Sequence, residues 1–345
     1  MALDLLALSV VSVANSIATL SAAYDHAIRL CAAAHVLRMD AATARVVAAL
    51  TDAYCAKNTR RAYVRGWERW RTWASEHGVR SFPAAPKWVA VYLTARAESG
   101  RAPATVHVDR AAIGAAHRAV GAVDPTASRA VRRALRSIGA TYCNRGRGQV
   151  EGLDWEDVDR TAALAESDGS LAGLRDAALL RLGSDALLRV SELASLVVSD
   201  LFVKPDGSGT ITVRRSKTDQ HGRGHVRYVG RSTVDAVRRY LQAAGIEAGA
   251  LFCGVNKGGA VRAGLGVRSI RRIITQRAAA AGIVGRISGH SLRVGAVQSL
   301  VAAGASLVDL QRAGDWKSPS MPGHYARHQL AERGAVARLR HGVAA

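Results

Sequence analysis

A ten-residue segment near the middle of the chain divides the sequence into two parts with different patterns. Residues 141–150 read TYCNRGRGQV and combine glycine with polar residues, without an apolar period. This composition is typical of a flexible linker. Because the chain has 345 residues, the sequence on each side is long enough to bury a core of its own. The sequence therefore predicts two folded domains joined by a linker over residues 141–151.

The two parts differ in the secondary structure that they predict. Residues 57–140 read as helices with very little strand, and Tyr63, Trp67 and Trp70 recur at the spacing of one helical face, which predicts a core position for these rings. Residues 1–56 form an apolar, alanine-rich N-terminal extension, either a packing helix or a misassigned start. Residues 152–345 predict a mixture, namely a helix over 174–188, strand-like runs over 209–215 and 225–229, and helices from 233 onward.

Positive charge dominates the chain and is densest in its first predicted domain. The 48 lysines and arginines against 27 aspartates and glutamates give a net charge of +21, and residues 57–150 alone carry a net charge of +13. A chain this basic indicates a polyanionic partner, with nucleic acid as the first candidate. The arginines on these helices either contact phosphate or form a solvated face; they are Arg61, Arg65, Arg69, Arg71, Arg129, Arg132, Arg133 and Arg136.

Cysteine spacing and hydropathy exclude several other classes. The four cysteines have no CxxC spacing, so they predict neither a zinc site nor a disulfide framework and are typical of reduced thiols in a cytoplasmic protein. The first apolar run, residues 5–14, is too short to span a bilayer and lacks a basic flank, so we expect no signal peptide and no membrane span. We expect no metal site and no cofactor.

Several groups suited to phosphoryl transfer follow one another in the second part. In chain order they are Arg189 and Glu192 in LLRVSEL, Lys217 in RRSKTDQ, His290 and Arg293 in HSLR, and Trp316 and Tyr325 in GDWKSPSMPGHYARH. Taken singly, each has a plainer interpretation, such as a helix cap for Arg189, a turn lysine for Lys217 or a core ring for Trp316. The spacing of three in HSLR predicts that its two groups share one helical face.

In this order and at these spacings, the segments ALLRVSEL, SKT, SGHSLRVGA and GDWKSPSMPGHYAR resemble the tyrosine recombinase, or phage integrase, family. The resemblance covers about residues 57–340. It implies a mainly α fold with a small β-sheet, in which a helical SAM-like core-binding domain and a mixed α/β catalytic domain close around duplex DNA as a C-shaped clamp. Two glycines common in the family are replaced here, by Leu187 and by Asp315.

The resemblance also implies the chemistry of the site. Tyr325 would attack the scissile phosphate to give a 3′-phosphotyrosine, while Arg189 and Arg293 would clamp the non-bridging oxygens. The remaining roles would be protonation of the leaving 5′-oxygen by Lys217, proton transfer or phosphate binding by His290, an indole N–H to the phosphate from Trp316, and orientation of the arginine and histidine side chains by Glu192.

The implied activity is site-specific DNA recombination through a Holliday junction, by a homotetramer on two synapsed duplexes with inverted-repeat sites. By the same resemblance, Arg60, Arg61, His107, Arg110 and Arg268 lie on helices that approach the bases. Two alternatives remain open: a type IB topoisomerase, which shares the nucleophile, and a catalytically silent architectural DNA-binding protein.

Overall fold

The computed structural model describes residues 41–53, 57–146, 148–214 and 224–341. It divides into two compact units, Met1–Arg147 and Gly148–Ala345, so the division falls inside the segment predicted as a linker. The lysine of the SKT motif, Lys217, and most of residues 1–56 lie outside the described residues. No helix in the described parts of the chain has both the length and the apolar character that crossing a bilayer requires.

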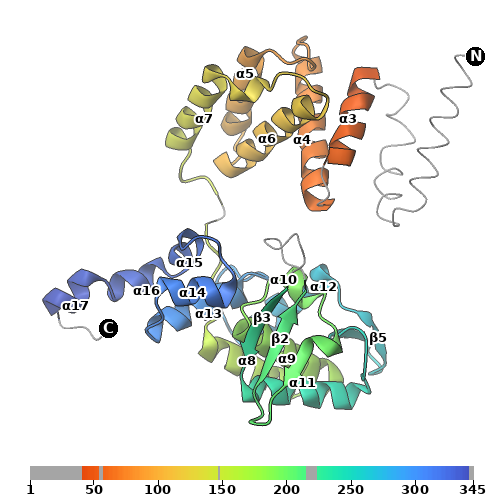
Figure 1. The fold of residues 1–345 in the computed structure, drawn as a ribbon, viewed down its shortest axis with the longest axis vertical. Helices are drawn as coiled ribbons and strands as arrows, with labels where there is room; N and C mark the ends of the chain where they lie inside the picture. Colours follow the sequence, from red (N-terminus) through yellow and green to blue (C-terminus); the bar gives the residue numbers. More distant parts are fainter. Residues whose placement is uncertain (1–40, 54–56, 147, 215–223, 342–345) are drawn as a thin grey trace, which may run out of the picture. The chain divides into compact units, whose positions relative to one another are not determined.

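The first unit is built from helices, as predicted (Figure 1). Its elements are α3 (Ala41–Ala53), α4 (Lys57–Glu76), α5 (Pro86–Glu98), α6 (Pro103–Ala119), the short 3-10 helix η2 (Pro125–Ala127) and α7 (Arg129–Thr141). Prolines at the first positions of α5 and α6 favour helix starts there, because proline fixes φ and the first turn needs no N–H donor. At α7 the Ser128 hydroxyl caps the helix by accepting from the Val131 amide.

The core of this unit contains the predicted aromatic stripe. Trp67 and Trp70 on α4 are fully buried and Tyr63 packs against them at the edge of the core. Val46 and Leu50 of α3 are also fully buried in the same core. Residues 41–53, which the sequence places in an N-terminal extension, therefore pack as part of the first unit, because α3 has an apolar face that α4 and α6 cover.

The second unit combines helices with two small antiparallel sheets (Figure 1). Its helices are α8 (Trp155–Glu166), α9 (Leu171–Asp185), α10 (Val190–Leu193), η3 (Val198–Asp200), α11 (Arg231–Ala244), α12 (Val267–Ala280), α13 (Ser291–Ala302), α14 (Leu307–Gly314), α15 (Ser320–Tyr325), α16 (Arg327–Glu332) and α17 (Ala335–His341). Its strands are β1 (Leu201–Val203), β2 (Gly209–Val213), β3 (His225–Val229), β4 (Cys253–Val255) and β5 (Val261–Gly264).

The three-stranded sheet has the order β1-β2-β3, with Ile211 of β2 opposite Arg227 of β3. The strands alternate, so that Ile211 and Val213 enter the core shared with α9 and α11 while Val226 and Tyr228 face outward. The predicted strands over 209–215 and 225–229 are confirmed, although β2 ends at Val213.

The helix predicted over 174–188 is shifted by three residues at each end. It begins at Leu171, where the Ser170 hydroxyl accepts from the Gly173 amide, and ends at Asp185. The end is set by Leu187, whose φ of 46° lies in the left-handed region and is incompatible with continuing the helix. The chain thus turns just before the first motif arginine.

One glycine decides how closely α13 approaches the start of the second unit. A Cβ at Gly295 would lie 1.8 Å from the Leu153 carbonyl oxygen, so only a hydrogen fits there. We expect Gly295→Ala to lower the free energy of unfolding by about 3 kcal/mol or more, because rigid backbone must move. Gly258→Ala is the control, since its nearest neighbour would be 3.6 Å away. Urea denaturation of both variants measures the difference, and equal midpoints would contradict this account of the packing.

Candidate active site

The turn between α9 and α10 presents the first predicted site residue. Arg189 immediately precedes α10, and its backbone N–H donates to Glu192 Oε2 over 2.9 Å. The Arg189 guanidinium also donates to Glu192 Oε1 over 2.6 Å. Glu192 is 2% exposed, so this carboxylate is held inside the protein and fixes the direction of the arginine. The structure therefore brings these two residues together.

The second predicted arginine, Arg293, lies on α13 and contacts two other segments of the unit. Arg293 is 1% exposed and donates to two backbone carbonyls, those of Leu187 and Gly314. Its guanidinium lies 3.9 Å from the centre of the Trp316 ring, in a cation–π arrangement. Burial and the nearby positive charge of Arg189 lower the pKa of Arg293 to about 9, so it remains charged at neutral pH. The turn after α9, the helix α13 and the end of α14 are thus linked through one side chain.

The predicted nucleophile is the last residue of α15. Tyr325 is 7% exposed, and its hydroxyl oxygen lies 3.1 Å from His290 Nε2. The Trp316 and Tyr325 rings are 6.1 Å apart in an edge arrangement. The backbone carbonyl of Tyr325 accepts from Gln149 and Gln298 over 3.0 and 3.3 Å, which anchors the end of α15. Loss of hydration raises the pKa of Tyr325, although Arg293 and Arg189 oppose the shift.

His290 lies at the start of the helix that carries Arg293. It is the N-cap residue of α13, its backbone has right-handed helical dihedral angles, and its carbonyl accepts from the Val294 amide over 3.0 Å. A glycine, Gly289, precedes it and the chain turns sharply into the helix at this point. The residue as a whole is exposed, but its ring contacts Tyr325. Loss of hydration, Arg293 and Arg189 all lower the pKa of His290, which favours the neutral imidazole.

Sequence reasoning missed a third arginine in this neighbourhood. Arg227 of β3 is 6% exposed and lies on the inward side of the sheet, 3.7 Å from Glu192. Two residues earlier on the same strand, His225 Nε2 lies 3.2 Å from Asp315 Oδ2. The signal was present in the alternation of HVRYV, where a charged residue occupies a position that should face the core.

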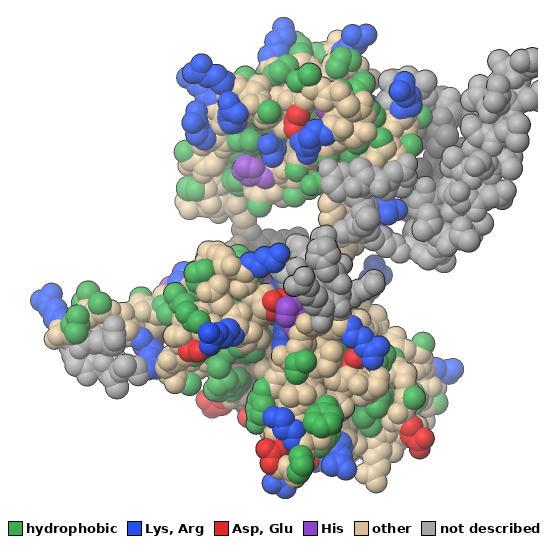
Figure 2. Space-filling model, in the orientation of Figure 1, with side chains coloured by type: hydrophobic (Ala, Val, Ile, Leu, Met, Phe, Trp, Pro, Cys, Tyr) green, Lys and Arg blue, Asp and Glu red, His purple; other side chains and the backbone are tan. Residues whose placement is uncertain are grey.

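The five predicted base-reading positions are spread over three helices. Arg60 and Arg61 lie near the start of α4, His107 and Arg110 lie on α6, and Arg268 lies in the first turn of α12, in the other unit. Arg61, His107 and Arg268 are exposed, whereas Arg60 and Arg110 are half-buried. Figure 2 shows lysine and arginine side chains at several places on the visible face of the first unit. Their contacts with bases stay a prediction.

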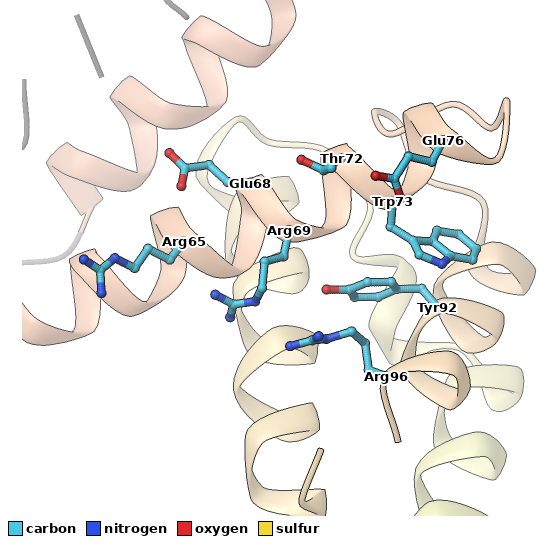
Figure 3. A pocket seen from close by; sticks show the side chains of 8 residues that line it. All are labelled: Arg65, Glu68, Arg69, Thr72, Trp73, Glu76, Tyr92 and Arg96. Atoms are coloured by element: carbon cyan, nitrogen blue, oxygen red, sulfur yellow. The ribbon is translucent and has the colours of Figure 1, made fainter. Parts of the chain in front are cut away.

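Two arginines of the first unit have a structural partner that the sequence did not reveal. Arg69 and Arg96 both pair with Asp109 of α6, which is fully buried. They line a pocket of about 390 Å³ beside the α4 and α5 helices, with the Tyr92 hydroxyl between them (Figure 3). Burial and the Asp109 charge raise the pKa of Tyr92 to about 12. Arg69 therefore helps to join α4 to α6 and is not simply part of a solvated face.

Comparison with known proteins finds relatives of this chain. The model of the phage integrase family matches residues 152–332. The chain is 27% identical over 287 residues to the Cre recombinase of Escherichia phage P1, which covers 78% of this chain and 84% of that relative. It is 30% identical over 292 residues to an integrase/recombinase XerD homologue of Selenomonas ruminantium, covering 81% of this chain and 83% of the relative.

Solved structures show the same fold at lower identity. The XerH site-specific recombinase bound to a palindromic difH substrate has a TM-score of 0.62 at 12% identity, covering 87% of this chain and 95% of that one. A lambda integrase dimer bound to a COC′ core site has a TM-score of 0.56 at 17% identity, covering 83% and 76%. Together with the family match over half of the sequence, these likenesses show that the chain belongs to the phage integrase family, the tyrosine-type site-specific recombinases.

Proposed function

We propose that this recombinase breaks and rejoins duplex DNA with Tyr325 as its nucleophile. The phenolic oxygen forms a bond to the scissile phosphorus while the bond to the 5′-oxygen breaks, which leaves a 3′-phosphotyrosine and a free 5′-hydroxyl. The 5′-hydroxyl of a second duplex then attacks the same phosphorus and the bond to the Tyr325 oxygen breaks. This step regenerates the phenol, joins the exchanged strand and generates a Holliday junction. The observation that carries the proposal is that Tyr325 and His290, 3.1 Å apart, lie close to both Arg189 and Arg293.

The other groups have complementary roles in the same step. The phenol proton passes to neutral His290, and Lys217 supplies the proton that the leaving 5′-oxygen takes up. Arg189 and Arg293 stabilise the extra negative charge on the non-bridging oxygens. Glu192 supports this role because its ion pair with Arg189 fixes the guanidinium. Trp316 packs against the guanidinium of Arg293 and donates its indole N–H to the phosphate.

The acid side of the pH profile tests the role of His290. Because its pKa is lowered from 6.5, the imidazole stays neutral at neutral pH and can accept the phenol proton. Protonation removes this acceptor, so the rate of DNA cleavage should fall on acidification with a midpoint below pH 6.5. Single-turnover cleavage between pH 5 and pH 8 measures this fall in rate. In His290→Asn, the rate should no longer depend on pH in this range. A midpoint at or above pH 6.5 would contradict the assignment.

The partner that we propose is a duplex with an inverted-repeat site, bound by dimers that pair into a tetramer. The high positive charge of residues 57–150 supports DNA binding, which would place the bound protein on the nucleoid within the cytoplasm. A lambda integrase tetramer of the same fold has been solved on a Holliday junction. Val336 and Leu339 of α17 are 68% and 86% exposed, which supports a neighbouring protomer as their cover.

The arginines of α7 give a test of backbone contact. Arg133 and Arg136 are exposed on this helix, and we expect each to release about one counterion from DNA. Changing both to glutamine should reduce the slope of log affinity against log salt by about 2. Changing both to lysine keeps the charge and should keep the slope. Titration of a labelled duplex at several salt concentrations measures the slopes, and an unchanged slope in the glutamine variant excludes phosphate contact by these side chains.

A nicked duplex substrate tests the proposed function as a whole. Cleavage near the nick releases a short strand, so the covalent protein–DNA adduct accumulates and is visible in a denaturing gel. We expect such an adduct on a specific inverted-repeat site, and strand exchange when two such sites are supplied. Relaxation of supercoiled DNA without sequence preference would instead indicate a topoisomerase, and binding without any adduct would indicate an architectural protein.

A further inference from the structure

The turn that precedes Arg189 has an unfavourable backbone conformation for its residue. Leu187 has a φ of 46°, and the structure gives only one other non-glycine residue in this region among those that it describes, Asp315. A side chain at positive φ brings Cβ close to the carbonyl oxygen, so glycine is the residue that normally occupies such a position. A leucine there persists only when surrounding contacts hold the turn.

Arg227 supplies contacts of this kind. Its Nη1 donates to the carbonyl oxygens of Ala186 and Leu187, over 2.6 and 2.9 Å. The Leu187 carbonyl also accepts from Arg293. One left-handed residue is therefore held through its carbonyl by two buried guanidinium groups, which arrive from β3 and from α13.

The cost of burying Arg227 argues against a purely packing role. Its Nε and Nη2 atoms are buried and have no hydrogen-bond partner among the described residues. Burial lowers the pKa of Arg227, and the nearby positive charge of Arg189 lowers it further, while Glu192 opposes the shift. An apolar side chain opposite Ile211 would avoid these penalties. Burying the Arg227 guanidinium therefore costs free energy. The hydrogen bonds that this side chain makes among the described residues go to the turn before Arg189.

We propose that Arg227 is a positioning residue that holds the Ala186–Leu187 turn in its left-handed form and so places the Arg189–Glu192 pair at the scissile phosphate. This inference rests on the proposed function, since Arg189 must contact the phosphate for its position to matter. Arg227 acts through the backbone: without its two hydrogen bonds, the turn can relax toward negative φ and carry Arg189 away from Tyr325. Misplacement of a catalytic group by about 1 Å can cost about 100-fold in rate.

The test combines loss of Arg227 with relief of the backbone strain. Arg227→Met should slow formation of the covalent adduct by about 100-fold at saturating DNA, with site affinity unchanged. Leu187→Gly adopts positive φ without a steric penalty. When Arg227→Met is combined with Leu187→Gly, the rate of adduct formation should therefore be within about tenfold of the rate of Leu187→Gly alone. Arg239→Met is the matched control, because Arg239 is an exposed arginine of α11 paired with Glu166.

The outcomes separate this inference from the function on which it rests. Single-turnover rates, site affinity and thermal unfolding are measured for every variant. If Arg227→Met unfolds, Arg227→Lys replaces it, because an ammonium retains the buried charge but cannot present a guanidinium to the turn. Arg227→Lys should slow adduct formation, and adding Leu187→Gly should relieve that slowing. Cleavage at the wild-type rate by Arg227→Met would overturn the positioning role. An equal slowing by Arg227→Met with and without Leu187→Gly would also overturn it. Failure of the unmodified protein to form an adduct would overturn the proposed function itself.

Discussion

Replacing Tyr325 with phenylalanine is expected to abolish the covalent protein–DNA adduct and all strand exchange. The substitution removes one oxygen atom, the phenolic oxygen that lies 3.1 Å from His290 Nε2. Removing an enzymatic nucleophile typically costs about 10⁴- to 10⁶-fold. Adduct formation on the nicked substrate, followed over hours, measures the loss.

Binding and folding should survive this change. The ring of Tyr325 packs beside Trp316 and Ala326, and phenylalanine retains that packing. Site affinity in a mobility-shift titration should therefore remain within about threefold of wild type, since little apolar contact is lost. Tyr228→Phe is the control, because Tyr228 lies exposed on the outer face of the sheet. A Tyr325→Phe variant that still forms the adduct would show that another group is the nucleophile.

The second large effect is expected at Arg293. Arg293→Lys keeps a positive charge, but a single ammonium cannot donate to both the Leu187 and Gly314 carbonyls and also face the phosphate as a planar fork. Loss of one oxyanion donor costs about 10²- to 10³-fold in rate. We expect cleavage to fall by at least this factor in single-turnover experiments.

The same substitution should also destabilise the second unit. A buried carbonyl left without a donor costs about 1–3 kcal/mol, and the lysine loses the contact between guanidinium and Trp316. Arg312→Lys is the control, because Arg312 is exposed on α14 and its replacement should change neither cleavage nor unfolding. Cleavage at the wild-type rate by Arg293→Lys would exclude Arg293 from the phosphate clamp.

Local patterns in the sequence predicted much of the architecture. The spacing of Trp67 and Trp70 predicted a buried helical face, and the alternation over 225–229 predicted β3, because periodicity depends only on neighbours along the chain. The family motifs identified the residues from Arg189 to Tyr325 by order alone. The structure places six of the seven motif residues in one cluster of contacting side chains, whereas Lys217 lies outside the described residues.

Other features depend on contacts that no local pattern encodes. Asp109 pairs with Arg96 and also with Arg69, which is 40 residues away in the sequence. Helix α3 packs into the core of the first unit, although it precedes residues 57–140, where the helical pattern was predicted. His290 lies at the N-cap of α13, one residue outside the helix, and local patterns do not fix a helix boundary to one residue.

By itself the sequence determined the chemistry available to this protein: a phenol, an imidazole and guanidinium groups in an order shared with one enzyme family. Only the tertiary structure decided how these groups are held. Arg293 reaches the Leu187 carbonyl across 106 residues, and Arg227 reaches the same carbonyl across 40. The physical reason is that a left-handed leucine is unfavourable in isolation, so its conformation, and the direction of Arg189 after it, depend on hydrogen bonds that exist only in the folded unit.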